Sequence, residues 1–287
     1  MRWKMKRISI LITAVLLAGN IFAAGRLKVV TSIMPLYNIT KAIAGGAADV
    51  SVIVPPGMSP HMFSPKPSQL IDMANAAVFV RVGAGLEYWA DKVISSSGNK
   101  KLVIVTVTDG MKLDGSDSDS PSGNPHVWLD PVIVKAFSAG IEKALAGADP
   151  ANKELYKKNL DKFTAGLDAL DKMLANETKK FRVKDLVSFH PSWYYFEKRY
   201  GLREAASIEA VPGREPSARE IQGIIGLVKQ YKIKAVFAET TLPRKDADVI
   251  AAEAGVKVLV LNPEGGEGDD YITFMKKNFL IMEEAMK

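Results

Sequence analysis

The sequence predicts an α/β fold in which two α/β lobes with parallel sheets are bridged by one long rigid helix. Three observations predict this architecture. Short β-branched runs alternate with helical patterns, which is typical of the βαβ units that build parallel sheets. One amphipathic segment near the middle of the chain is much longer than an ordinary globular helix. Beyond that segment the alternation resumes.

Residues 1–25 have the pattern of a secretory signal peptide. Four basic residues precede an apolar run at 8–17, and small residues follow at 23–25. The apolar run is too short to cross a bilayer, which disfavours an uncleaved anchor. The chain contains no cysteine, so it lacks the residue that a lipoprotein needs at its cleavage site. We therefore expect a soluble periplasmic protein without a direct membrane anchor. We also expect it to be a monomer.

The first predicted lobe covers residues 26–148. Its β-branched runs and helical patterns alternate as a parallel sheet requires. The expected strands are 27–31, 50–54, 77–82 and 102–107, and the expected helices are 36–44, 68–75 and 86–95.

Residues 149–180 are predicted to form the bridging helix. Asp149 can cap its start, and Pro150 suits the first helical position. About 30 residues give a helix of about 45 Å, long enough to span two lobes. Its apolar face repeats at spacings of three and four: Leu160, Phe163, Leu167, Leu170 and Leu174.

The second predicted lobe covers residues 181–287. A capping box at Ser217 and Glu220 marks one helix start. The expected strands are 185–189, 235–238 and 256–261, and the expected helices are 217–230, 246–254 and a last one from about 269.

Composition excludes several classes of function. The net charge of +6 is mostly that of the leader, because the rest of the chain carries 34 basic and 32 acidic groups. No nucleic-acid partner is expected from so balanced a surface. The absence of cysteine excludes thiolate nucleophiles, redox pairs and thiolate zinc sites. No nucleotide-binding or serine-hydrolase motif is present.

The three histidines of the chain, His61, His126 and His190, all lie beside a proline in expected loops. Two of these loops follow expected strands, and ligand sites in open α/β sheets gather at the carboxyl ends of strands. A single histidine in such a place carries little information. Three together indicate a metal site, because three imidazoles with a carboxylate or water suit tetrahedral Zn²⁺.

Five sequence words carry a family resemblance. They occur in order from about residue 27 to the C-terminus and together resemble the zinc/manganese-type solute-binding proteins of ABC importers, the ZnuA-like and TroA-like group. The words are PPGMSPHMFSPKPSQ at 55–69, NPHVWLDP at 124–131, SFHPSWYYFEKRYGL at 188–202, GREPSARE at 213–220 and VFAETTLPRKDADVIAAEAGVKVLVLNP at 236–263.

The resemblance implies a periplasmic receptor that holds a divalent metal in the cleft between the lobes and delivers it to an ABC importer permease in the inner membrane. It implies that His61, His126 and His190 are metal ligands. Manganese-selective relatives tend to carry glutamate at the third position, so His190 favours Zn²⁺ over Mn²⁺, as nitrogen ligands also do. A manganese- or iron-selective receptor of the same family remains an alternative.

The fourth ligand is open at this point. Many relatives place an aspartate where this chain has Asn262, and an amide oxygen is a weaker ligand than a carboxylate. The candidates are water, Asn262 and Glu239 at the end of an expected strand. Glu239 could instead accept a hydrogen bond from a ligating imidazole and orient it.

Two other classes of function compete with a receptor. Three histidines and a zinc-bound water could form the active site of a hydrolase. Glu239 is the one candidate for its general base. A surface adhesin is the third class, and a chain without a lipid-anchoring cysteine suits it poorly. We expect a binding protein rather than an enzyme.

Overall fold

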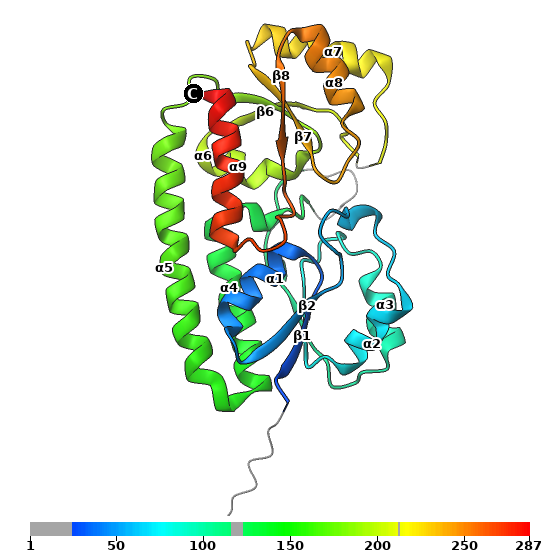
Figure 1. Ribbon diagram of the computed structural model, residues 1–287, viewed down its shortest axis with the longest axis vertical. Coiled ribbons are helices and arrows are strands. Elements are labelled where there is room, and N and C mark those ends of the chain that lie inside the picture. The colour runs from blue at the N-terminus through cyan, green and yellow to red at the C-terminus, as the bar shows by residue number, and fades with distance from the viewer. Residues whose placement is uncertain (1–24, 116–122, 212) are drawn as a thin grey trace, which may run out of the picture.

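The computed structural model describes residues 25–115, 123–211 and 213–287 and confirms the two-lobed α/β architecture (Figure 1). Nearly all of the expected signal peptide lies outside the described residues. Each lobe holds a four-stranded sheet whose paired strands are all parallel. The first sheet has the order β2-β1-β3-β4 and the second β6-β5-β7-β8, so both lobes share one topology without a repeat in sequence.

The strands lie close to where the sequence predicts them, except that β6 was not expected. In the first lobe they are β1 Leu27–Thr31, β2 Ala48–Val52, β3 Val78–Arg81 and β4 Val103–Thr106. In the second they are β5 Asp185–Ser188, β6 Arg203–Ser207, β7 Ala235–Glu239 and β8 Lys257–Leu261.

The first lobe contains one helix more than the sequence analysis predicts. Its helices are α1 Met34–Ala44, α2 Pro67–Asn75, α3 Ala90–Ser97 and α4 Pro131–Ala148. The unexpected helix is α4. Its start is well marked, because the Asp130 side chain accepts hydrogen bonds from the backbone N–H groups of Val132 and Ile133 and Pro131 occupies the first turn.

The bridging helix is α5, Lys153–Thr178, which follows a short 3₁₀ turn at Pro150–Asn152. Asp149 does not cap α5 as expected. It ends α4, and its carboxylate accepts hydrogen bonds from Asn152 and Tyr156. The apolar face expected for α5 is buried. It packs against α1 and α4 of the first lobe and α9 of the second, so α5 runs alongside both lobes (Figure 1).

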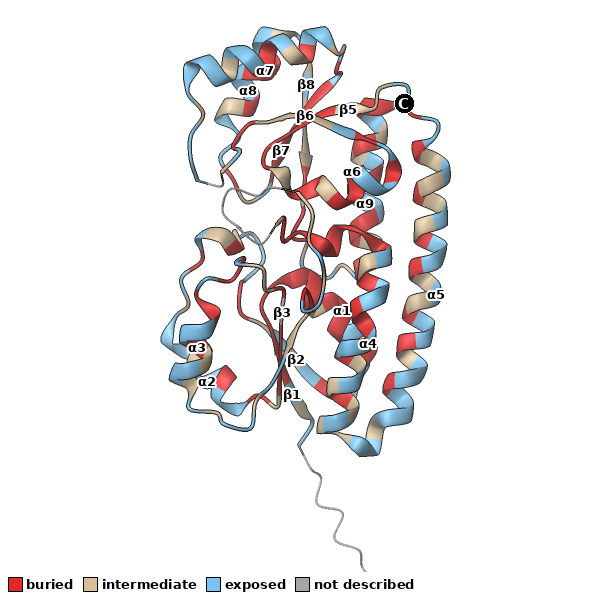
Figure 2. Ribbon diagram, turned by 180° about the vertical axis from the view of Figure 1, so that it is seen from behind, coloured by how far each residue is buried: buried red, intermediate tan, exposed pale blue. Residues whose placement is uncertain are grey.

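The second lobe contains α6 Tyr194–Tyr200, α7 Ala218–Gln230, α8 Lys245–Ala254 and α9 Tyr271–Met286. The capping box before α7 is present, with both reciprocal hydrogen bonds between Ser217 and Glu220. The short helix α6 was not expected. On α7 and α8, buried residues line the face toward the sheet and exposed residues line the outer face (Figure 2).

The segment after β8 connects the two lobes. The indole N–H of Trp128, before α4, donates to the Pro263 carbonyl at 2.8 Å, and the Tyr271 hydroxyl donates to the Trp128 carbonyl at 2.7 Å. Both aromatic side chains are buried. One apolar core cluster contains residues of both lobes. In the described part of the chain, no helix is long and apolar enough to cross a membrane.

Candidate metal centre

The three histidines come together where strands of both sheets end. His61 lies in the 3₁₀ turn Pro60–Met62 after β2, His126 lies beyond β4, and His190 lies just after β5. The carboxyl ends of parallel strands meet at one edge of a sheet, and these edges of the two lobes face each other. His126 and His190 are buried, and His61 is half-buried.

The spacing of the imidazoles fits a single small cation. Nε2 of His126 lies 3.2 Å from Nε2 of His61 and 3.1 Å from Nε2 of His190. Ligand atoms from all three residues lie within 4.8 Å of one another. Zinc–nitrogen bonds of about 2.0–2.1 Å give a tetrahedron with edges of about 3.3 Å, close to these distances. Among the described residues, no other group of three or more histidines and acids is this close.

A neighbouring amide sets the orientation of His126. Nδ1 of His126 lies 2.8 Å from Oδ1 of Asn124, and the same oxygen accepts the His126 backbone N–H at 2.9 Å. An oxygen that accepts from Nδ1 requires the proton on Nδ1. The lone pair of His126 is therefore on Nε2, which points to the other histidines.

A carboxylate lies against the outer nitrogen of His190. Oε1 of Glu239, the last residue of β7, lies 2.8 Å from Nδ1 of His190. The opposite ring nitrogen, Nε2, faces His126. Glu239 therefore lies on the side of the His190 ring that is away from His126. Its oxygens are not among the ligand atoms that cluster within 4.8 Å. A carboxylate on the far side of a metal-binding imidazole commonly helps to orient the ring.

The buried environment keeps two of the imidazoles, those of His61 and His126, neutral. Burial, and then the neighbouring His190, lowers the pKa of His61 to about 3. Burial also lowers the pKa of His126 well below the ordinary value, with His190 and His61 acting in the same direction. Neutral imidazole is the form that binds a metal. The site therefore offers nitrogen lone pairs without first having to release protons from these two residues.

Asn262, the other candidate for a fourth ligand, is engaged in the turn after β8. Its side-chain oxygen accepts the backbone N–H of Glu264 at 3.1 Å. Its backbone N–H and carbonyl bind the side chain of Asn278 in α9 at 2.7 Å and 3.0 Å. These contacts give Asn262 a structural role in the loop.

Two buried carboxyl groups, Glu264 and Glu87, are not among the site residues predicted from the sequence. Burial raises the pKa of Glu264 to about 8, with His190 acting against the shift and Glu239 and Glu87 adding to it. Glu87 accepts hydrogen bonds from the Ser32 hydroxyl and from two backbone N–H groups, and burial raises its pKa. Glu264 comes two residues after Asn262, the candidate ligand named from the sequence, so its position could have indicated a place near the site.

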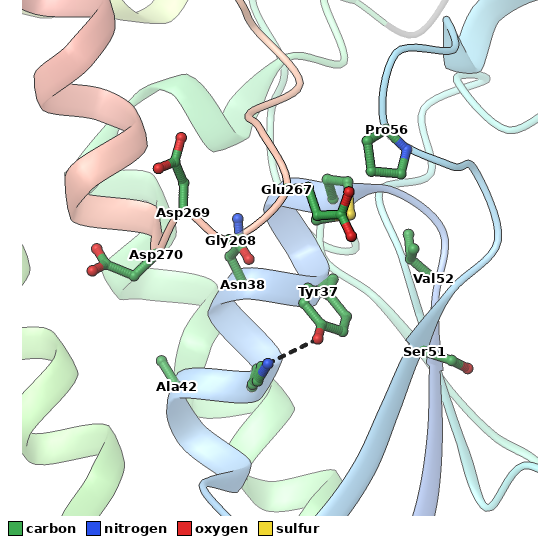
Figure 3. A pocket seen from close by; sticks show the side chains of 12 residues that line it. Tyr37, Asn38, Ala42, Ser51, Val52, Pro56, Glu267, Gly268, Asp269 and Asp270 are labelled. Atoms are coloured by element: carbon green, nitrogen blue, oxygen red, sulfur yellow. Dashed lines mark hydrogen bonds between the residues drawn. The ribbon is translucent and has the colours of Figure 1, made fainter.

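A surface cavity of about 520 Å³ lies apart from the histidines, between α1, β2 and the segment before α9 (Figure 3). None of the three histidines lines it. Lys41 at its wall donates to the Tyr37 hydroxyl at 2.9 Å, and Asp269 pairs with Lys277 at 2.7 Å. The cavity therefore contributes nothing to the metal centre.

Comparison with known proteins decides the family. Residues 29–285 match the family described as "Zinc-uptake complex component A periplasmic". The chain belongs to this family. ZnuA-family members are solute-binding proteins rather than enzymes, so the hydrolase alternative is not supported. The resemblance drawn from the five sequence words is confirmed.

Relatives and solved structures agree with this assignment. The chain is 30% identical to the high-affinity zinc uptake system protein ZnuA of Bacillus subtilis (strain 168), covering 91% of this chain and 88% of the relative. It is 30% identical to the zinc-binding lipoprotein AdcA of Streptococcus pneumoniae, covering 98% of this chain but only 61% of that longer protein.

Two solved structures share the fold over most of this ZnuA-family chain. A crystal structure of ZnuA superimposes with a TM-score of 0.84 at 32% identity, covering 91% of this chain and 99% of that one. The laminin-binding protein Lmb of Streptococcus agalactiae, described as an adhesin with metal transporting activity, gives a TM-score of 0.83 at 30% identity, covering 91% and 100%.

Proposed function

We propose that this ZnuA-family chain captures one Zn²⁺ ion outside the inner membrane and delivers it to the permease of an ABC importer. One observation carries the proposal: three buried or half-buried imidazoles direct their Nε2 atoms to a common point, at separations of 3.1 and 3.2 Å. The zinc uptake named for the Bacillus subtilis relative supports the choice of cargo.

His61, His126 and His190 supply three nitrogen ligands in this proposal. Glu239 acts on the metal through His190, which its 2.8 Å contact with Nδ1 supports. Water takes the fourth position, because the Glu239 carboxylate faces the outer nitrogen of the ring and the Asn262 oxygen is engaged in its loop. Three nitrogen ligands favour Zn²⁺ over Mn²⁺, which prefers oxygen.

The word "periplasmic" in the family description supports a location outside the cytoplasm for this chain. Our finer proposal is a soluble receptor without a lipid anchor, because the sequence contains no cysteine. The Streptococcus pneumoniae relative is named a lipoprotein, so the point needs a test. Most of the protein should appear in the soluble periplasmic fraction of its host, and recovery in the membrane fraction would contradict this.

Competitive titration of the mature chain with Zn²⁺ and a chelating dye tests the cargo and the ligands. We expect one tight zinc per chain. His126→Ala should weaken binding by at least 100-fold, because it removes a ligand and leaves a gap between the other two. Lys41→Ala, at the separate cavity of Figure 3, is the matched control and should bind as the wild type does.

Two results would contradict the proposal: no tight zinc binding by the wild type, or equal affinity for zinc in the wild type and His126→Ala. An anomalous scattering scan at the zinc edge on the metal-bound crystal would identify the ion and the fourth ligand. A manganese-selective receptor would instead bind Mn²⁺ more tightly than Zn²⁺ in the same titration.

A further inference from the structure

Asn124 occupies a special place between the two lobes. It precedes His126 by two residues on the first-lobe side of the cleft, and it is only 1% exposed. We propose that Asn124 is a positioning residue that holds His126 in its metal-binding orientation and at the same time fixes that ligand relative to the loop of His190. This inference rests on the proposed function, because it assumes that the histidines bind metal.

One end of the Asn124 amide is committed to His126. Its Oδ1 accepts the backbone N–H of His126 at 2.9 Å and lies 2.8 Å from Nδ1 of the same residue. These two contacts hold the ring from two directions. The imidazole therefore cannot turn its Nε2 away from the cluster without losing a buried hydrogen bond.

The other end of the amide reaches the second lobe. Nδ2 of Asn124 donates to the carbonyl of Pro191 at 2.7 Å, and Pro191 directly follows His190. The Asn124 backbone carbonyl accepts the hydroxyl of Tyr195, in α6, at 2.8 Å. Two separate hydrogen bonds thus connect Asn124 to the segment that carries the third histidine.

The surrounding groups determine which way the amide faces. A backbone N–H beside one end requires an acceptor there, and a carbonyl beside the other end requires a donor. Only a side-chain amide of this length supplies both. An aspartate would keep the acceptor for His126 but place an oxygen against the Pro191 carbonyl, and an alanine would supply neither group.

The substitutions Asn124→Asp and Asn124→Ala separate these two roles. Long-range ¹H–¹⁵N NMR of the metal-free protein reports the tautomer of His126, and hydrogen exchange reports the stability of residues 188–196. We expect Asn124→Asp to keep the Nδ1–H tautomer while exchange in 188–196 speeds up. We expect Asn124→Ala to change both readouts and to weaken zinc binding about 10- to 100-fold, as the loss of a ligand-orienting group does.

Asn99→Ala is the matched control. Asn99 also makes two hydrogen bonds through Nδ2, at 3.1 and 2.7 Å, but both partners lie within the first lobe. It should lower stability without changing the His126 tautomer, the exchange of 188–196 or zinc binding. A His126 tautomer and a 188–196 exchange rate that are unchanged in Asn124→Ala, or changed equally in Asn99→Ala, would overturn the inference. Failure of the wild type to bind zinc would overturn the proposed function instead, because both metal-free readouts stand without zinc.

Discussion

Oε1 of Glu239 lies 2.8 Å from Nδ1 of His190, and these side chains are only 1% and 4% exposed. The contact joins the end of β7 to the loop after β5, two neighbouring strands of the second sheet. It places a carboxylate behind the imidazole, on the side away from the other histidines. A buried carboxylate in that position orients a metal-binding imidazole and makes its other nitrogen a better electron-pair donor to a metal.

Replacing Glu239 should therefore change metal affinity without removing a ligand. Glu239→Ala removes the carboxylate beside Nδ1 of His190, and we expect zinc affinity to fall about 10- to 100-fold. Glu239→Gln keeps an oxygen that can accept from Nδ1–H but loses the charge, so a smaller loss is expected. Competitive zinc titration measures the three affinities. We expect the wild type to bind zinc most tightly, Glu239→Gln less tightly and Glu239→Ala least tightly.

Glu220→Gln is the control for this series. Glu220 is exposed and belongs to the capping box of α7, in which glutamine serves as well as glutamate. Its zinc affinity should equal that of the wild type. Equal affinities for Glu239→Ala and the wild type would show that His190 needs no such support.

The strands β2 and β4, which lead to His61 and His126, could be predicted from the sequence because short β-branched runs mark them. Helix α4 is absent from the predicted elements although Asp130-Pro131 signals its start, and the same pair ends the family segment at 124–131. Asp130-Pro131 thus marks a helix start and belongs to a family motif at the same time.

The contacts around the histidines could not be predicted. Asn124 lies in the family segment 124–131, but its amide donates to the Pro191 carbonyl, 67 residues away. Glu239 meets His190 only because β5 and β7 pair in the sheet. Such partners are set by the packing of distant loops, which leaves no local spacing to read.

The lowered pKa of His61 predicts how the metal-free protein responds to acid. The folded pKa is about 3, and an unfolded histidine has a value near 6.5, so between these values the unfolded chain binds a proton that the folded chain does not. The contribution of neutral His61 to the free energy of unfolding is thus complete above about pH 6.5, and it is lost as the pH falls toward 3. His61→Asn, which cannot titrate, should flatten this part of the profile.

Urea unfolding of wild type and His61→Asn at pH 7.5, 5.5 and 4.5 measures the effect. We expect the wild type to lose more stability than the variant between the first and last of these values. If the free energy of unfolding fell equally with pH in both proteins, His61 would take up its proton in the folded state as easily as in the unfolded chain.

Glu264 should make the stability of the metal-free protein fall with rising pH, the opposite of the effect of His61. Its folded pKa of about 8 lies above the ordinary value of 4.5, so the folded chain holds a proton there that the unfolded chain has released. Stability from this carboxyl is complete below about pH 4.5 and is lost as the pH rises through 8. Glu264→Gln, a neutral isostere, should raise the melting temperature of the metal-free protein at pH 8.5 and change it little at pH 4.5.

Glu267→Gln, in the same segment but exposed, is the comparison for Glu264. It should leave the melting temperature unchanged at both pH values. A melting temperature at pH 8.5 that is no higher in Glu264→Gln than in the wild type would contradict the raised pKa.

The contact between Tyr271 and Trp128 should stabilise the docking of the lobes without acting on the metal. The Tyr271 hydroxyl donates to the Trp128 carbonyl at 2.7 Å, and both residues are at most 1% exposed. Tyr271→Phe leaves that buried carbonyl without this donor, which costs about 1–3 kcal/mol in the free energy of unfolding. Tyr37→Phe removes the hydroxyl that accepts from Lys41 at an exposed position, where the expected cost is below about 1 kcal/mol. Urea denaturation should therefore separate the two variants, while zinc affinity should match the wild type in both. A loss of zinc affinity in Tyr271→Phe would instead show that the lobe interface controls the geometry of the histidines.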